Sequence, residues 1–144
     1  MPNFPLDLRA AVAVALVTLA AGCGRGRPAL NPVHGKVYYQ GKALGSGTIV
    51  FTPDASRGGN GALARSEVQA DGSYSLRTDQ AYGAAPGWYR VTVMAVKAPG
   101  KPAPGQRYAV PQSLLPERYR DPELADLVRE VKDGRENDID FHLD

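Results

Sequence analysis

The sequence predicts an all-β protein, a single antiparallel β-sandwich of about seven strands that follows an N-terminal export signal. Short runs of β-branched and aromatic residues alternate with polar residues in a period of two. This period places successive side chains on opposite faces of a sheet. Turn residues separate the runs, and the 144 residues include 16 Gly and 12 Pro, a composition that favours many turns over long helices.

Two strands that begin at turn signals are the firmest part of this prediction. Asp71-Gly72 is a turn signal, because glycine accepts a positive φ and aspartate bonds its own backbone, and a strand follows over 73–76. Pro86-Gly87 precedes a strand predicted over 88–97. The side chains expected to face the core are Tyr74, Leu76, Tyr89, Val91 and Val93. The side chains expected on the outward faces are Ser73, Ser75, Trp88, Arg90 and Thr92.

Five further strands complete the predicted sandwich. They are expected over residues 33–39, 48–52, 62–69, 128–132 and 139–143. Pro53 closes the second of these, because proline cannot donate to a ladder. The segment 78–85 is expected to be a loop, and the Pro/Gly-rich stretch 98–111 a surface loop with extended backbone. Two prolines limit 114–127 to one or two helical turns.

The N-terminus carries an apolar run over residues 10–21 that ends at Gly22-Cys23. Twelve residues are too few to span a hydrocarbon core of about 30 Å as a helix, but they fit the apolar part of a signal peptide. Residues 19–23 resemble the bacterial lipobox, in which small residues precede a cysteine that receives lipid. We therefore expect a lipoprotein signal peptide over 1–22, a flexible tether over 23–32 and one domain over 33–144. An ordinary secretory signal and a buried helix with an incidental cysteine are the alternatives.

A family resemblance is carried by four segments: 33–44, 47–53, 71–76 and 86–93. They resemble the successive strands of carboxypeptidase-regulatory-like domains, which have the transthyretin-like (prealbumin-like) sandwich fold. The tail from Leu115 to Leu127 and the closing strands are similar to a version abundant among small predicted lipoproteins of Planctomycetes. Ala125-Asp126 departs from the Thr-Ser pair that is frequent there. The resemblance implies a fold and a lipoprotein. It does not imply an activity, because this fold carries many functions.

Catalysis and metal binding have weak support in the residues. Hydroxyisourate hydrolases share the transthyretin-like fold and use several histidines, whereas this chain has two, His34 and His142, both at polar positions of predicted strands. Loop carboxylates could bind Ca²⁺, but none has the spacing of a dedicated site. The candidates are Asp54, Asp71, Asp79, Asp138 and Asp140. The sequence thus predicts a non-enzymatic protein without cofactor or metal.

Exposed aromatic rings are the remaining candidate ligand surface. Flat rings stack on sugars, and Tyr38 and Trp88 are expected on outward strand faces. The complete set is Tyr38, Tyr82, Trp88 and Tyr108. The 17 basic and 15 acidic residues are well mixed, which disfavours a nucleic-acid binder. We expect an envelope lipoprotein held by membrane lipid through Cys23 that binds or supports envelope proteins, with glycan binding as the alternative and a small hydrolase as a third.

Overall fold

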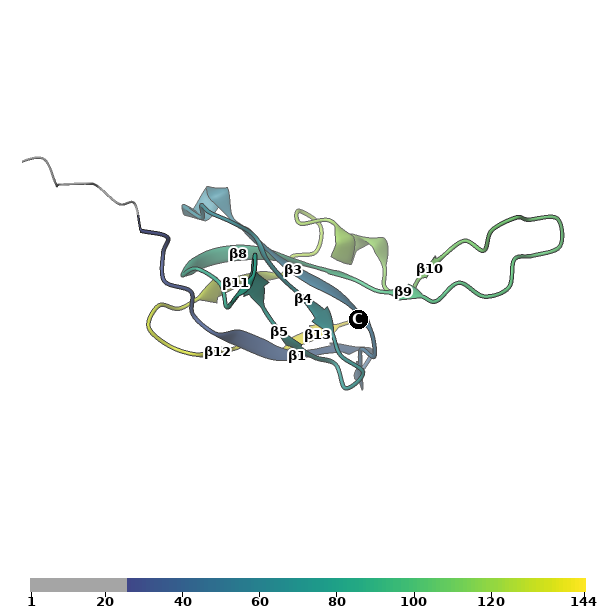
Figure 1. Ribbon diagram of the computed structural model, residues 1–144, viewed down its shortest axis with the longest axis horizontal. Helices are drawn as coiled ribbons and strands as arrows, with labels where there is room; N and C mark the ends of the chain where they lie inside the picture. Colours follow the sequence, from purple (N-terminus) through teal and green to yellow (C-terminus); the bar gives the residue numbers. More distant parts are fainter. Residues whose placement is uncertain (1–25) are drawn as a thin grey trace, which may run out of the picture.

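The structure, a computed structural model, describes residues 26–144, and within that range the protein is all-β. Eleven of its thirteen short strands form two main sheets that lie face to face, and the other two form a separate pair (Figure 1). The only helical segments in that range are two 3-10 turns, η1 (Ala55–Arg57) and η2 (Glu117–Arg120). The predicted all-β class is therefore confirmed, and the two facing sheets are consistent with the predicted sandwich. The strands are shorter and more numerous than the seven that were expected. The predicted signal peptide and Cys23 lie outside the described residues.

The first sheet is built around β1 (Val33–Tyr39). On one side β1 pairs antiparallel with β2 (Lys42–Ala43) and β5 (Ser73–Ser75). On the other side it pairs in parallel with β12 (Asn137–Asp138) and β13 (Phe141–Leu143). The prediction of a wholly antiparallel sandwich is thus wrong for this sheet. The chain enters β12 beside Val33, where β1 begins, and therefore runs in the same direction as β1.

The second sheet has six strands in the order β11-β8-β3-β4-β6-β7. Their bounds are Val128–Val131 (β11), Gly87–Met94 (β8), Gly47–Pro53 (β3), Ala64–Val68 (β4), Arg77–Thr78 (β6) and Ala81–Tyr82 (β7). All pairs in this sheet are antiparallel. The segment 78–85, expected to be a loop, contains part of the β6–β7 hairpin. The sequence did not reveal these strands, because two residues are too few to show an alternation.

Aromatic side chains from both sheets fill the core between them. The Phe51 ring of β3 lies 5.9 Å from the Phe141 ring of β13, edge to face, and 6.3 Å from the Tyr74 ring of β5. The buried hydroxyl of Tyr74 donates to the Ile139 carbonyl at 2.6 Å, so the ring adds packing without leaving a polar atom unpaired. All five side chains predicted to face the core from the strands after Asp71-Gly72 and Pro86-Gly87 are buried.

One outward position of β8 differs from the prediction. Thr92 is buried, although it alternates with core residues. The chain after η2 lies over this outer face, as shown by the bond of 2.6 Å from Arg90 Nη1 to Glu123 Oε2. The helical turn expected in 114–127 is thus present and covers part of the sheet.

A projecting loop and the start of the described chain lie at opposite ends of the molecule. At one end β9 (Val96–Lys97) and β10 (Gln112–Ser113) pair and lead into a long loop that projects from the sandwich (Figure 1). The described chain begins at the opposite end (Figure 1). The predicted tether is packed at its end, because Asn31 is buried and exchanges backbone hydrogen bonds with Ala84. The folded part thus begins before residue 33.

Candidate functional site

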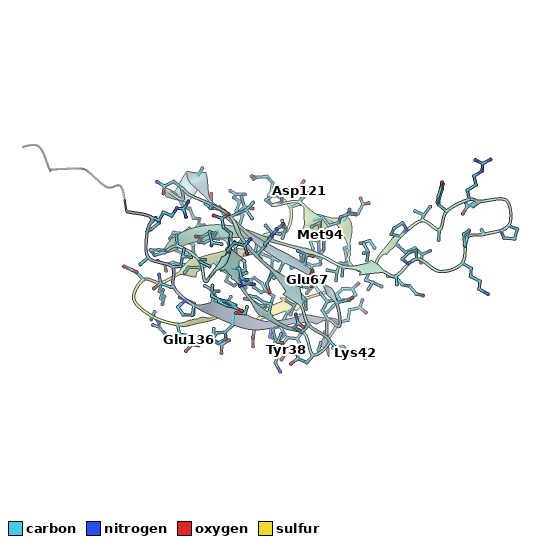
Figure 2. All side chains as sticks on the ribbon, in the orientation of Figure 1. Tyr38, Lys42, Glu67, Met94, Asp121 and Glu136 are labelled. Atoms are coloured by element: carbon cyan, nitrogen blue, oxygen red, sulfur yellow. The ribbon has the colours of Figure 1, made fainter. Side chains whose placement is uncertain are left out.

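The four aromatic residues proposed as a ligand surface lie on separate parts of the molecule. Tyr38 is on the outer face of the first sheet, and Trp88 belongs to β8 of the second sheet. Figure 2 shows Tyr38 on the side of the sandwich away from Met94, which ends β8. Tyr82 is in the edge strand β7, and Tyr108 is in the projecting loop. The structure does not bring them together as one platform.

Three of these rings already contact a neighbouring side chain. Tyr38 stacks on His142 with ring centroids 4.8 Å apart and an interplanar angle of 4°. The guanidinium carbon of Arg57 lies 4.7 Å from the Trp88 ring centroid, and that of Arg77 lies 4.2 Å from Tyr82. Tyr108 has no stacking or cation–π partner within residues 26–144, and 82% of its surface is exposed. Tyr108 is therefore the ring best placed to meet a ligand.

The projecting hairpin, defined here as residues 96–113, is the strongest candidate site. Its base is fixed by the pairing of Lys97 with Gln112 and by a 2.8 Å bond from the Leu114 N–H to the Ala95 carbonyl. Its tip is the turn 103–106, in which the Gln106 N–H donates to the Ala103 carbonyl at 2.9 Å. Pro104 and Gly105, with φ +88°, occupy the central positions, as a type II turn requires.

The hairpin carries positive charge without any carboxylate. No acidic residue occurs between Asp79 and Glu117. The hairpin contains Lys97, Lys101 and Arg107, and none of them forms an ion pair with another described residue. Sequence reasoning treated the charges as evenly mixed and missed this concentration. The signal that would have revealed it is the long interval without an acidic residue.

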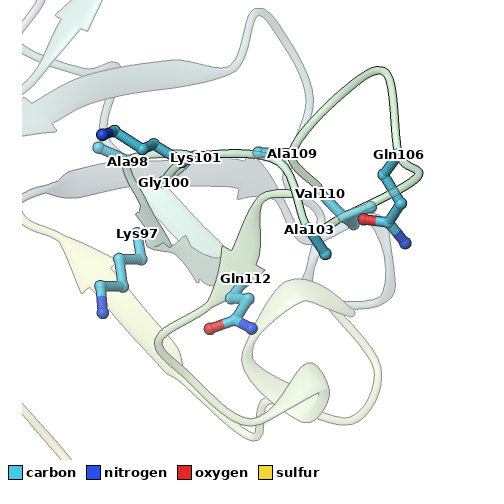
Figure 3. A pocket seen from close by; sticks show the side chains of 9 residues that line it. All are labelled: Lys97, Ala98, Gly100, Lys101, Ala103, Gln106, Ala109, Val110 and Gln112. Carbon is cyan, nitrogen blue, oxygen red and sulfur yellow. The ribbon is translucent and has the colours of Figure 1, made fainter.

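A hollow of about 390 Å³ lies along the projecting hairpin (Figure 3). Lys97 and Gln112 are opposite each other at its base, so their side chains share one face of the strand pair. The lining residues are Lys97, Ala98, Gly100, Lys101, Ala103, Gln106, Ala109, Val110 and Gln112. Two lysines and two glutamines therefore share the lining with three alanines, Gly100 and Val110, and the polar members of this set suit an anionic or hydroxylated ligand.

The two histidines lie apart on the outer face of the first sheet. His34 Nε2 is 2.7 Å from Glu136 Oε1, and His34 Nδ1 is 3.6 Å from Asp138 Oδ1. His142 pairs with Tyr38, which lies four residues after His34 in β1. At the rise of a strand, the backbone positions of His34 and Tyr38 are about 13 Å apart. Each histidine thus has its own neighbours, and the two do not converge on one point.

Among the calcium candidates, Asp54 is buried instead of exposed in a loop. Its Oδ1 accepts bonds from the Ser56 hydroxyl at 2.6 Å and the Ser56 N–H at 3.0 Å, and lies 3.4 Å from Arg90 Nε. These hydrogen bonds and the Arg90 charge hold the pKa of Asp54 below its ordinary value, although burial opposes the shift. Oδ2 has no hydrogen-bond partner and lies 3.6 Å from Arg57 Nε. The carboxylate caps η1 and forms ion pairs with arginines.

The other candidate carboxylates are also dispersed. Asp71 accepts bonds from the hydroxyl and N–H of Ser73, which lower its pKa and confirm its role in the turn. Asp140 accepts the Lys36 N–H at 2.7 Å. Asp138 is near His34, and Asp79 is in the left-handed region with φ +53°. Residues 26–144 contain no group of three or more His, Cys, Asp or Glu side chains that could hold a metal ion.

Comparison with known proteins adds no family assignment. The chain matches no protein-family model, no curated protein and no solved structure. Within the described range, no helix is long and apolar enough to cross a membrane.

Proposed function

We propose that this protein is an exported bacterial lipoprotein that acts as a binding module at the cell envelope, with the projecting hairpin as its binding element. One observation carries the proposal: the hairpin leaves the sandwich at the end opposite the one where the described chain begins (Figure 1). An anchor at one end and an unpaired, charged element at the other suit a protein that reaches from a membrane towards a partner.

The anchor in this proposal is lipid on Cys23, which follows the apolar run 10–21. One acyl chain holds a protein only marginally, whereas several chains together hold it stably. Residues 23–30 precede the packed Asn31 and can span roughly 25 Å when extended. This length would allow the sandwich to stand clear of the lipid headgroups.

The finer fold assignment in the proposal is the transthyretin-like sandwich of carboxypeptidase-regulatory-like domains. The all-β sandwich and the positions of β1, β3, β5 and β8 at the four resembling segments support it. Membership of the Planctomycetes-type lipoproteins is proposed on the same segments and on the tail that contains η2.

Catalysis is not part of the proposal. His34 is bonded to Glu136 and His142 is stacked on Tyr38, and both arrangements support structural roles. A panel of ester, amide and lactam substrates tests this point with the wild type and a His34→Ala/His142→Ala variant. Turnover that the wild type shows and the double variant loses would replace the binding module by a hydrolase.

The first experiment measures intact mass and membrane partitioning after expression in a bacterium, beside Cys23→Ser. We expect cleavage before Cys23 with added acyl mass, and loss of both in the variant. A protein that is cleaved elsewhere and stays soluble would reject the anchor.

A second variant, in which residues 98–111 are replaced by Asn-Gly, tests the binding element through pull-down from envelope extract. Partners that survive this replacement would reject the hairpin as the binding element.

A further inference from the structure

We propose that the projecting hairpin binds a carboxylated glycan, a polymer whose sugar rings carry uronic-acid carboxylates. This inference rests on the proposed role of the hairpin as the binding element. It adds the chemical class of the ligand and assigns Lys101, Arg107 and Tyr108 to its recognition.

The positive charge of the hairpin indicates the charge of its ligand. Lys97, Lys101 and Arg107 lie within one hairpin that contains no carboxylate, and they form no ion pair among the described residues. Elsewhere in residues 26–144, Arg57, Arg90 and Arg118 form ion pairs with carboxylates. Like charges without counter-charges attract anions, and a projecting element brings them close to a ligand. The ligand should therefore be anionic.

The Tyr108 ring provides the second step. It is the most exposed large apolar side chain of residues 26–144, it follows Arg107 directly, and no described side chain stacks on it. An exposed aromatic ring on the same hairpin as several cations fits a sugar ring that carries a carboxylate, because the apolar face of the sugar stacks while the carboxylate pairs with a cation. A simple polyanion without rings would use only the charges.

Hydrogen-bonding groups along the hairpin provide the third step. The hollow of about 390 Å³ has the size of a small-ligand site and includes the amides of Gln106 and Gln112 (Figure 3). Between residues 98 and 111, the bond from the Gln106 N–H to the Ala103 carbonyl is the only backbone hydrogen bond within the loop. Free backbone groups and amides can bond the hydroxyls of a sugar.

The geometry favours a glycan over an acidic protein surface. A stable protein interface covers roughly 800 Å² on each partner around an apolar centre. The two arms of the hairpin instead present separate polar groups along the hollow, and the one exposed aromatic ring of the hairpin, Tyr108, lies outside the lining of the hollow. Val96, Val110 and Leu114 are also exposed, so an acidic protein is the competing outcome that the experiment must separate.

The experiment titrates the purified exported protein with oligogalacturonate by calorimetry. A neutral galactose oligomer of equal length and polyglutamate serve as the two comparison probes. The variants are Tyr108→Ala and Lys101→Gln/Arg107→Gln. The matched controls are Tyr82→Ala, an exposed tyrosine on another surface, and Lys42→Gln, an exposed lysine in β2. Circular dichroism of each variant verifies the fold.

We expect oligogalacturonate to bind and the neutral oligomer to bind at least tenfold more weakly. Tyr108→Ala should weaken binding roughly three- to tenfold and the double charge variant roughly tenfold, with both controls within about twofold. Raised salt should weaken binding. Polyglutamate that binds as tightly as oligogalacturonate, or a Tyr108→Ala variant with full affinity, would overturn the glycan assignment and favour an acidic protein.

The experiments distinguish a wrong ligand class from a wrong proposed function. A protein with lipid on Cys23 and hairpin-dependent envelope partners that shows no affinity for oligogalacturonate would overturn the glycan assignment alone. A protein that binds the uronate without an acyl group would support the ligand class while it rejects the anchor.

Discussion

Asp54 shows at the residue scale how a loop carboxylate becomes part of the fold. The residue follows Pro53 at the end of β3, and its backbone N–H donates to the Trp88 carbonyl at 2.9 Å. The side chain bonds Ser56 and lies beside Arg90, which in turn bonds Glu123. This network links the loop after β3, strand β8 and the segment after η2 on one face.

The lowered pKa of Asp54 predicts a pH dependence of stability. A carboxylate whose folded-state pKa lies below its unfolded value of about 3.9 stabilises the protein above that pH, and the contribution is lost as pH falls through the folded pKa. Urea titrations of wild type and Asp54→Asn should therefore give a gap in the free energy of unfolding that is constant from pH 7 to 5 and narrows below about pH 4.

The control for this titration is Asp79→Asn, which removes an exposed carboxylate that forms no ion pair with another described residue. It measures the effect of losing one negative surface charge. A gap for Asp54→Asn that stays the same down to pH 2 would show that the bonds from Ser56 and Arg90 do not favour the ionised form.

At the scale of elements, the parallel pairing of β1 with the C-terminal strands depends on a close approach at Gly35. A Cβ placed there would overlap the carbonyl of Ile139, between β12 and β13. The Ile139 N–H donates to the His34 carbonyl at 2.8 Å, and the Lys36 N–H donates to Asp140. Glycine at this position allows the two segments to meet.

Gly35→Ala is therefore expected to destabilise the protein by about 1–3 kcal/mol, because backbone must move to accommodate the methyl group. Chemical denaturation measures the loss. Gly100→Ala is the control, since a Cβ at Gly100 would meet nothing within 4 Å and the effect should stay within about 0.5 kcal/mol. Equal stability of the two variants would mean that β12 and β13 do not approach β1 as closely as described.

The projecting hairpin should be separable from the stability of the sandwich. Lys97 pairs with Gln112, so an Asn-Gly turn can replace residues 98–111. Because shorter loops cost less closure entropy, the free energy of unfolding should stay unchanged or rise by up to about 2 kcal/mol. Thermal unfolding measures this difference, and a lower melting temperature would show that the loop packs on the sandwich.

At the scale of the whole molecule, one aromatic cluster joins the two sheets. The Phe141 ring belongs to the first sheet and lies 5.9 Å from the Phe51 ring of the second sheet and 6.2 Å from the Tyr74 ring. The C-terminus is fixed in place as well, because the Tyr119 hydroxyl bonds Asp144 Oδ1 at 2.7 Å. The last strand thus completes a core that earlier strands begin.

Phe141→Ala is expected to lower the free energy of unfolding by about 3–5 kcal/mol, since it leaves a cavity between the sheets. This is a large part of the total of about 5–15 kcal/mol that is usual for a domain. Trp88 fluorescence and far-UV circular dichroism should report the same transition. The comparison variant is Leu124→Ala, which truncates an exposed side chain and should cost little. A small loss for Phe141→Ala, or two separate transitions, would contradict a single core.

The strands and the faces that they bury were predictable from the sequence, because turn residues and a period of two are local signals. Tyr74, Leu76, Val91 and Val93 are buried as their alternation indicated. The pairing of β1 with β13 was not predictable, since alternation says nothing about which strands become neighbours or in which direction they run. The same reason separates Tyr38 from Trp88: both point outward, but from different sheets.

The sequence by itself determined the all-β class, the turns at Asp71-Gly72 and Pro86-Gly87, and the residue types available for a site. The tertiary structure alone decided that Asp54 is buried beside arginines and that Tyr108 is exposed without a stacking partner among the described residues. Burial and the isolation of a charge depend on which segments fold back onto a residue. Contacts between residues distant in the chain set these properties, and local sequence patterns do not report them.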